Sequence, residues 1–182
     1  AGCSISLVEG DRGQMAPDDV QRAIRKVAGS DSHYPECTLI CVENTANVGG
    51  GSIYEQKTMD AICEIAHLND CNAHLDGARM FNAVVASGTE ASRMVRQFDT
   101  VSVCLSKGLG APVGSVLVGN ESTIAEAHRW RKMFGGGMRQ AGLLAAAGLY
   151  ALDNNIDRLS EDHARARRLA EAVNEIGKYS VD

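Results

Sequence analysis

Lys107 lies between two short apolar segments, residues 100–105 and 115–118, that the sequence predicts as buried strands. A buried lysine costs free energy unless its charge is paired or its amine is used covalently. Lysine forms Schiff bases with carbonyl compounds once burial lowers the pKa of its amine, and the glycines at 108 and 110 let another group approach closely. This segment alone leaves two interpretations open: a lysine that carries pyridoxal phosphate (PLP), and a strand-end lysine that extends into solvent.

A carboxylate and a guanidinium follow another predicted strand. Asp76 ends an apolar segment that contains Ala73 and Leu75, and a helix is predicted over residues 78–87. Ligands of open α/β sheets collect at the carboxyl ends of strands, where a carboxylate can keep the pyridine nitrogen of PLP protonated. Asp76 is equally suited to cap the helix. Arg79 is suited to bind a substrate carboxylate, and is otherwise a solvated helix residue.

Strands and helices alternate along the chain, which predicts an α/β fold with a mostly parallel sheet flanked by helices on both faces. The connection between the strands on either side of Lys107 is too short for a helical crossover, so this pair is expected to be antiparallel. The other expected strands are 38–42 and a short one around Ala73, and the expected helices are one from Pro17, then 57–68, 78–87, 90–97, 138–153 and 156–176.

Size and composition exclude several classes of protein. A chain of 182 residues suits one domain, and its net charge of −5 argues against a nucleic-acid or anionic-membrane partner. No apolar run approaches the roughly 20 residues of a membrane span. The six cysteines lack CxxC pairs, which indicates a reducing, cytoplasmic location, and the histidines lack metal-ligand spacing. The glycine clusters lack the spacing of a nucleotide-binding loop.

Four segments together resemble the low-specificity L-threonine aldolases, which are PLP-dependent enzymes of the aspartate aminotransferase fold. The segments are 43–45 (Glu-Asn-Thr), 74–88, 105–114 and 132–140, and they occur in the order of the family. The second and third are the most specific, and the resemblance covers essentially the whole chain. It implies that residues 1–155 are most of a PLP-binding large domain and that 156–182 form a helix leading to a small C-terminal domain.

The resemblance also implies roles at the cofactor. Lys107 would be the catalytic residue that holds PLP, and Asp76 would pair with its pyridine nitrogen. Arg139 is similar to a basic residue that lies near the cofactor in the family. From its spacing alone, Arg139 is equally explained as an arginine that flanks a turn.

For the substrate, the resemblance implies a small amino acid held by Arg79, Glu43 and Lys132. The implied reaction is the cleavage of threonine or allo-threonine to glycine and acetaldehyde, a step of amino-acid metabolism. The implied assembly is a homodimer or homotetramer with active sites at subunit boundaries. Lys132 would reach a neighbouring subunit's site, although a solvated helix residue explains it equally well.

The chain departs from the family at two positions. Ala46 stands where a histidine near the substrate hydroxyl is usual, and Glu55 stands where a proline is usual. Three other parts of the family's site are expected outside residues 1–182. They are the phosphate-binding turn, the histidine that stacks on PLP and a second substrate-binding arginine. Two alternatives therefore stay open: a non-catalytic folding or oligomerisation module, and another PLP reaction such as racemisation or transamination.

Overall fold

Four β-strands form one sheet in the part of the chain that the computed structural model describes, residues 2–25 and 35–181. The strands are β1 (Leu39–Glu43), β2 (Asn72–Asp76), β3 (Thr100–Cys104) and β4 (Ser115–Gly119), and they lie side by side in this order. The first three are parallel, and β4 is antiparallel to β3. The pairing predicted from the short connection around Lys107 is thus confirmed.

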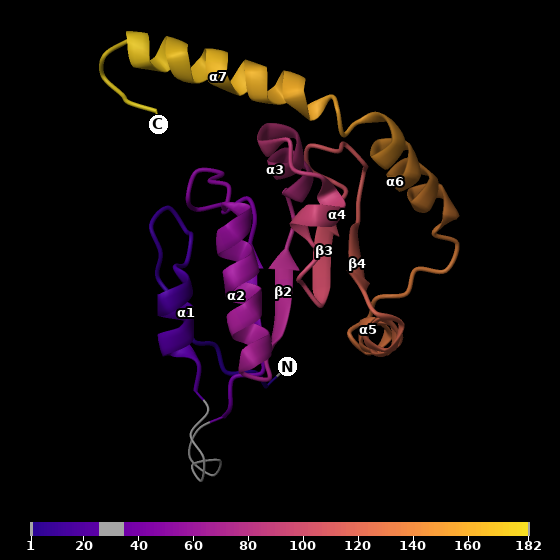
Figure 1. Cartoon of the computed structure of the whole chain (residues 1–182). Helices are drawn as coiled ribbons and strands as arrows, with labels where there is room; N and C mark the ends of the chain where they lie inside the picture. The colour runs from indigo at the N-terminus through magenta and orange to yellow at the C-terminus, as the bar shows by residue number, and fades with distance from the viewer. Residues whose placement is uncertain (1, 26–34, 182) are drawn as a thin grey trace.

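Seven helices accompany this sheet in the described ranges (Figure 1). They are α1 (Pro17–Ala23), α2 (Gln56–Leu68), α3 (Met80–Ser87), α4 (Ala91–Met94), α5 (Glu121–Met133), α6 (Gly142–Asn154) and α7 (Leu159–Glu175). Local sequence determines where some of these helices begin and end. Asn120 caps the start of α5 by accepting a hydrogen bond from the Thr123 backbone amide at 2.9 Å. Gly88 ends α3 in the left-handed conformation with φ of 69°. No helix of the described residues is long and apolar enough to cross a membrane.

The sheet buries one face. Alternate strand residues point to this face and pack against Met59 and Ile62 of α2, so the strands and helix share one apolar core. Full burial of side chains of this size contributes about 1.5–3 kcal/mol each. The buried strand residues are Ile40, Val42, Ala73, Leu75, Val101 and Val103.

The opposite face carries no buried residue among those described, so the expectation of helices on both faces is wrong for this part of the chain. The reason is that α1, α2 and α3 all contribute to the core on the first face. The prediction that the strand after Lys107 is buried is also wrong. β4 is an edge strand on which Val116 and Val118 are 42% and 52% exposed, even though they share a face with the buried residues of β3.

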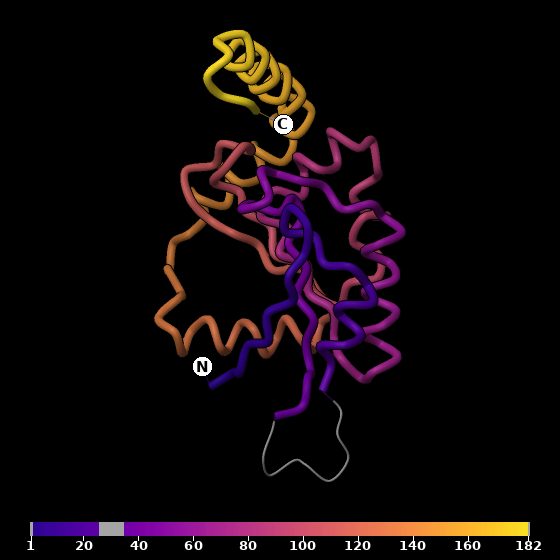
Figure 2. Tube along the Cα trace, turned by 90° about the vertical axis from the view of Figure 1, so that its left-hand side faces the viewer, coloured from indigo at the N-terminus to yellow at the C-terminus, as the bar shows by residue number. Residues whose placement is uncertain are grey.

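A second apolar cluster lies where α6 meets α7. Ala151 and Leu159 pack there against Leu109 and Ala111, which belong to the loop that follows β3. Figure 1 shows α7 passing over α3 at the end of the sheet toward which β2 points. Figure 2 shows α5 at the other end of the molecule from α7. The two ends of the sheet are therefore covered by different parts of the C-terminal half.

Candidate active site

The parallel strands bring the predicted site residues to one edge of the sheet. Glu43 pairs in register with Asp76, and Asp76 pairs with Ser102. The Gly77 amide then donates a hydrogen bond to the Ser102 carbonyl at 2.8 Å, which continues the pairing past the end of β2. Because β3 runs parallel to β2, the loop that carries Lys107 leaves the sheet at the same edge as Asp76.

Lys107 is exposed, which overturns the expectation that it is buried. The loop rises beyond the sheet edge and the following strand is itself exposed, so the lysine is not enclosed by two buried strands. Its amine makes no hydrogen bond or ion pair with any described residue. The amine is therefore accessible to a carbonyl group in this arrangement.

The backbone around Lys107 is closed into a compact loop by its own hydrogen bonds. The Leu105 amide donates to the Gly114 carbonyl at 2.9 Å, and the Ala111 amide donates to the Leu105 carbonyl at 3.0 Å. The Gly110 amide donates to the Lys107 carbonyl at 2.9 Å, with Gly110 in the left-handed conformation at φ of 76°. These bonds fix where the lysine backbone stands relative to β3.

Asp76 keeps one carboxylate oxygen free. Its Oδ1 accepts a hydrogen bond from the Ala78 amide at 3.1 Å, whereas Oδ2 has no hydrogen-bond partner among the described residues. The helix-capping interpretation is wrong, because the cap position of α3 is Arg79 and no side chain caps that helix. Asp76 is exposed and available to an N–H group of a ligand.

Arg79, Asn47 and Glu43 form a chain of hydrogen bonds along this edge. The Arg79 Nη1 donates to the Asn47 side-chain oxygen Oδ1 at 3.0 Å. The Asn47 backbone amide donates to the Glu43 Oε2 at 3.0 Å. Arg79 precedes α3 instead of lying in its first turn, since the helix begins at Met80 and not at residue 78. Asn47 does not stand out in the sequence; its only distinguishing feature is its place two residues after the 43–45 motif.

Two neighbours of Glu43 are buried away from this edge. Asn44 is fully buried, accepts a hydrogen bond from the Tyr54 amide at 3.3 Å, and faces the Met59 sulfur. The Asn44 side chain therefore lies in the apolar core and not at the sheet edge with Glu43. Ala46 is 2% exposed, and a β-carbon on Gly13 would come within 3.1 Å of its methyl group. A histidine at position 46 has no room unless the turn around Gly13 moves.

A histidine lies below Asp76 on the open face of the sheet. The His74 Nδ1 is 2.7 Å from the Thr100 hydroxyl oxygen. Burial lowers the pKa of His74, and the negative charge of Asp76 only partly opposes this effect. On the adjacent strand, partial desolvation raises the pKa of the Cys41 thiol, although this residue is exposed on the open face, and the charges of Asp76 and Cys37 add to the effect. Neither a charged imidazole nor a thiolate is therefore favoured beside Asp76 at neutral pH.

Lys132 and Arg139 lie elsewhere. Lys132 is exposed near the end of α5, the helix that lies opposite α7 in Figure 2. Arg139 is exposed in the connection between α5 and α6. Among the described residues neither side chain contacts Asp76 or Lys107 through a hydrogen bond or ion pair. One copy of the chain thus joins four of the six predicted residues at the sheet edge.

The residues at this edge fit PLP. Schiff-base formation needs a lysine amine that a carbonyl can reach, and Lys107 is exposed and unpaired within the described ranges. A pyridine nitrogen needs an acceptor, and the free Oδ2 of Asp76 supplies one. Both groups leave adjacent strands at their carboxyl ends, so the two requirements are met on one side of one sheet.

The fold is that of PLP-dependent enzymes related to the aminotransferases. A putative L-allo-threonine aldolase from Listeria monocytogenes superposes with a TM-score of 0.79 at 24% identity, over 93% of this chain and 45% of that one. Threonine aldolase from Leishmania major gives a TM-score of 0.78 at 18% identity, over 96% and 51%. A PLP-bound C-S lyase from Staphylococcus hominis gives 0.57 at 15% identity, over 92% and 41%. The predicted fold class is confirmed.

Within this class the chain belongs to the beta-eliminating lyase family, whose model matches residues 1–182. It is 46% identical over 170 residues to the probable low-specificity L-threonine aldolase 2 of Arabidopsis thaliana, covering 93% of this chain and 48% of that protein. It is 46% identical over 158 residues to the low specificity L-threonine aldolase of Escherichia coli strain K12, covering 87% and 46%. The resemblance found in the sequence is confirmed. The chain spans about half the length of these relatives.

Proposed function

We propose that the protein containing this chain is a PLP-dependent lyase that cleaves threonine and allo-threonine to glycine and acetaldehyde. One observation carries the proposal: an accessible lysine and a carboxylate with a free oxygen leave neighbouring parallel strands at the same edge. The similarity to proteins named as low-specificity threonine aldolases supports the choice of reaction. It does not favour a non-catalytic module, a racemase or a transaminase.

Lys107 and Asp76 hold the cofactor in this proposal. When bound, PLP accepts the electron pair that remains on the substrate α-carbon after the Cα–Cβ bond breaks. The Lys107 amine attaches the cofactor covalently, and the compact loop fixes its direction of approach. The Asp76 carboxylate holds a proton on the pyridine nitrogen through its free oxygen. That negative charge stabilises the protonated ring.

Arg79 and Glu43 bind the substrate. The Arg79 guanidinium has five N–H donors, and the bond to Asn47 uses one of them, which leaves others for the substrate carboxylate. The Asn47 backbone amide also donates a hydrogen bond to one oxygen of the Glu43 carboxylate. The remaining acceptor positions of Glu43 face the polar groups of the amino acid. Asn47 thereby sets the spacing of the two substrate-binding side chains.

The same proposal covers assembly and location. Lys132 and Arg139 serve the active site of a neighbouring subunit in a homodimer or homotetramer, with Lys132 near the substrate and Arg139 near the cofactor. The position of α5, which carries Lys132, supports this for the lysine, because this helix lies at the other end of the molecule from α7. Residues 1–155 belong to the large domain and 156–182 lead to the small one. The protein is cytoplasmic and binds neither nucleic acid nor membrane, in keeping with its net charge of −5 and with six cysteines that lack CxxC spacing.

The test uses the full-length protein. Loaded with PLP, it is expected to release acetaldehyde and glycine from threonine, and Lys107→Ala is expected to reduce the rate to background. Lys178→Ala is the matched control, since this lysine lies beyond the end of α7. A full-length protein that yields no acetaldehyde contradicts the proposal, as does an unchanged rate in Lys107→Ala. Analysis of products from alanine and serine separates cleavage from racemisation and transamination.

A further inference from the structure

We infer that Asn155 is a positioning residue for Lys107: its side-chain amide fixes the loop that presents the lysine amine to the cofactor. The inference rests on the proposed function and deepens it. The sequence marks residues around 155 only as the end of one helix and the start of another. In the structure, this junction between α6 and α7 lies against the loop of residues 105–114 that carries Lys107, called the lysine loop below.

The contact is a hydrogen bond to the loop backbone. The Asn155 Nδ2 donates to the Leu109 carbonyl at 2.7 Å. Leu109 lies inside the turn that the Gly110 amide closes on the Lys107 carbonyl. Asn155 is half-buried, and its own backbone amide is held by the Ala151 carbonyl at 3.0 Å. The Asn155 side-chain amide is therefore anchored at the end of α6 and reaches the turn that contains Lys107.

Apolar packing holds the junction in place on both sides of this bond. Leu109 and Ala111 of the loop are buried against Ala151 and Leu159, which flank Asn155 in sequence. A polar bond made within such a cluster is shielded from competing water, so its loss leaves the Leu109 carbonyl without a partner. The loop is thus fixed by one directional bond within an apolar contact.

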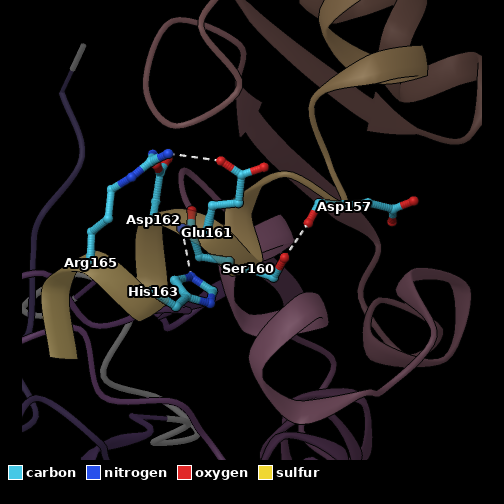
Figure 3. Close-up of polar contacts among 7 residues, drawn as sticks. Asp157, Ser160, Glu161, Asp162, His163 and Arg165 are labelled. Atoms are coloured by element: carbon cyan, nitrogen blue, oxygen red, sulfur yellow. Dashed lines mark hydrogen bonds and ion pairs between the residues drawn. The ribbon is translucent and has the colours of Figure 1, made fainter. Parts of the chain in front are cut away.

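The junction also reaches the other half of the site. The Asn82 Nδ2 is 3.1 Å from the His163 Nε2, and this pair joins α3 to the first turns of α7. Figure 3 shows His163 among the polar contacts at the start of α7, where the Ser160 hydroxyl donates to the Asp157 carbonyl at 2.7 Å. α3 directly follows the segment that carries Asp76 and Arg79. The helix α7 therefore contacts α3 on one side of the site and the loop that carries Lys107 on the other.

Asn154 provides a matched control. Its Nδ2 donates to the Tyr150 carbonyl of its own helix at 2.8 Å, and its side chain is exposed. The two asparagines are adjacent and each caps a carbonyl, but only Asn155 caps one in the lysine loop. A purely helix-capping role predicts similar effects for both.

The experiment measures the loop and the cofactor separately in the full-length protein. Without PLP, amide hydrogen exchange of residues 107–111 is expected to be about tenfold faster in Asn155→Ala, and unchanged in Asn154→Ala. With PLP, the visible absorbance of the lysine-bound cofactor is expected to form about tenfold more slowly in Asn155→Ala. Ile62→Val, a mild change in the distant core, controls for general destabilisation.

Each outcome decides the inference. Faster loop exchange together with slower cofactor attachment, both confined to Asn155→Ala, supports it. Equal effects in Asn154→Ala or Ile62→Val overturn it, and so does unchanged loop exchange or unchanged attachment in Asn155→Ala. If wild-type protein attaches no PLP while Asn155→Ala still loosens the loop, the proposed function has failed and the role toward the cofactor fails with it. The structural clamp on the loop would then stand alone.

Discussion

Gly108 lies directly against Leu159, so that a β-carbon placed on Gly108 would come within 2.7 Å of the Leu159 Cδ2. Leu159 is 1% exposed and belongs to the cluster that supports the lysine loop. The glycine after Lys107 therefore makes room for a side chain of the same chain. The close approach expected from the sequence exists, but here it is made by α7 and not by a ligand.

We expect Gly108→Ala to lower the free energy of unfolding by about 1–3 kcal/mol, because the added methyl group overpacks a buried contact. Urea denaturation of the full-length protein measures this. Gly142→Ala is the control, since a β-carbon there meets nothing within 4 Å and the residue begins α6. Equal stability of the two variants would show that Leu159 moves aside without cost.

Ala46→His is expected to destabilise the protein by about 1–3 kcal/mol, since the buried methyl group faces Gly13 with no space for an imidazole. The change should also release the turn around Gly13, which limited proteolysis at Arg12 detects. Val48→His, at a 99% exposed position nearby, serves as the comparison. If Ala46→His is as stable and as protease-resistant as Val48→His, the packing described for Ala46 is incorrect.

Arg79→Ala should raise the KM for threonine by about 10–100-fold in the PLP-loaded full-length protein, because a charged hydrogen bond to the substrate carboxylate is lost. Asn47→Ala should raise KM less, since it removes only the bond that orients Arg79 at 3.0 Å. Steady-state kinetics measure both values. An unchanged KM in Arg79→Ala would remove this residue from the substrate site.

Stability should depend on Asp60 in acid. The hydrogen bond from Arg93 holds the pKa of Asp60 below its ordinary value, and burial opposes it. A carboxyl whose pKa is lowered on folding stabilises the protein above its unfolded pKa of about 3.9, and this stability is lost as the pH falls through the folded pKa. Denaturation between pH 6 and pH 3 (about the range in which aspartate titrates) should show a shallower decline in Asp60→Asn than in wild type.

The comparison for that titration is Asp153→Asn, an exposed carboxylate with no ion-pair partner among the described residues. It should retain the acid decline of the wild type. If Asp60→Asn also retains it, the contact between Asp60 and Arg93 contributes nothing to acid stability.

The sequence was sufficient where local pattern determines structure. A short connection fixed the antiparallel pairing of β3 with β4, and a carboxylate after an apolar strand located Asp76 at the sheet edge. Burial of Lys107 was predicted wrongly because apolar residues on an edge strand look the same in sequence as those on an inner strand. Val116 and Val118 show this: their side chains are apolar, but no helix among the described residues buries them.

Contacts between distant segments could not be predicted. Asn155 reaches Leu109 across 46 residues of sequence, and Asn82 reaches His163 across 81. An asparagine at the end of a helix is ordinary in sequence, since its side chain commonly caps a nearby carbonyl. Only the packing of α6 and α7 on the lysine loop distinguishes Asn155 from Asn154. The residues that support the site can therefore be identified only from the fold, whereas Lys107 and Asp76 can be predicted from sequence motifs.

The central claim is that Lys107 carries the cofactor. Full-length protein is incubated with PLP, reduced with sodium borohydride to make the cofactor–lysine bond permanent, digested, and mapped by mass spectrometry. One modified peptide is expected, the one that contains Lys107, and it should be absent in Lys107→Ala. Modification of a different lysine, or none in folded protein, would contradict the assignment of Lys107.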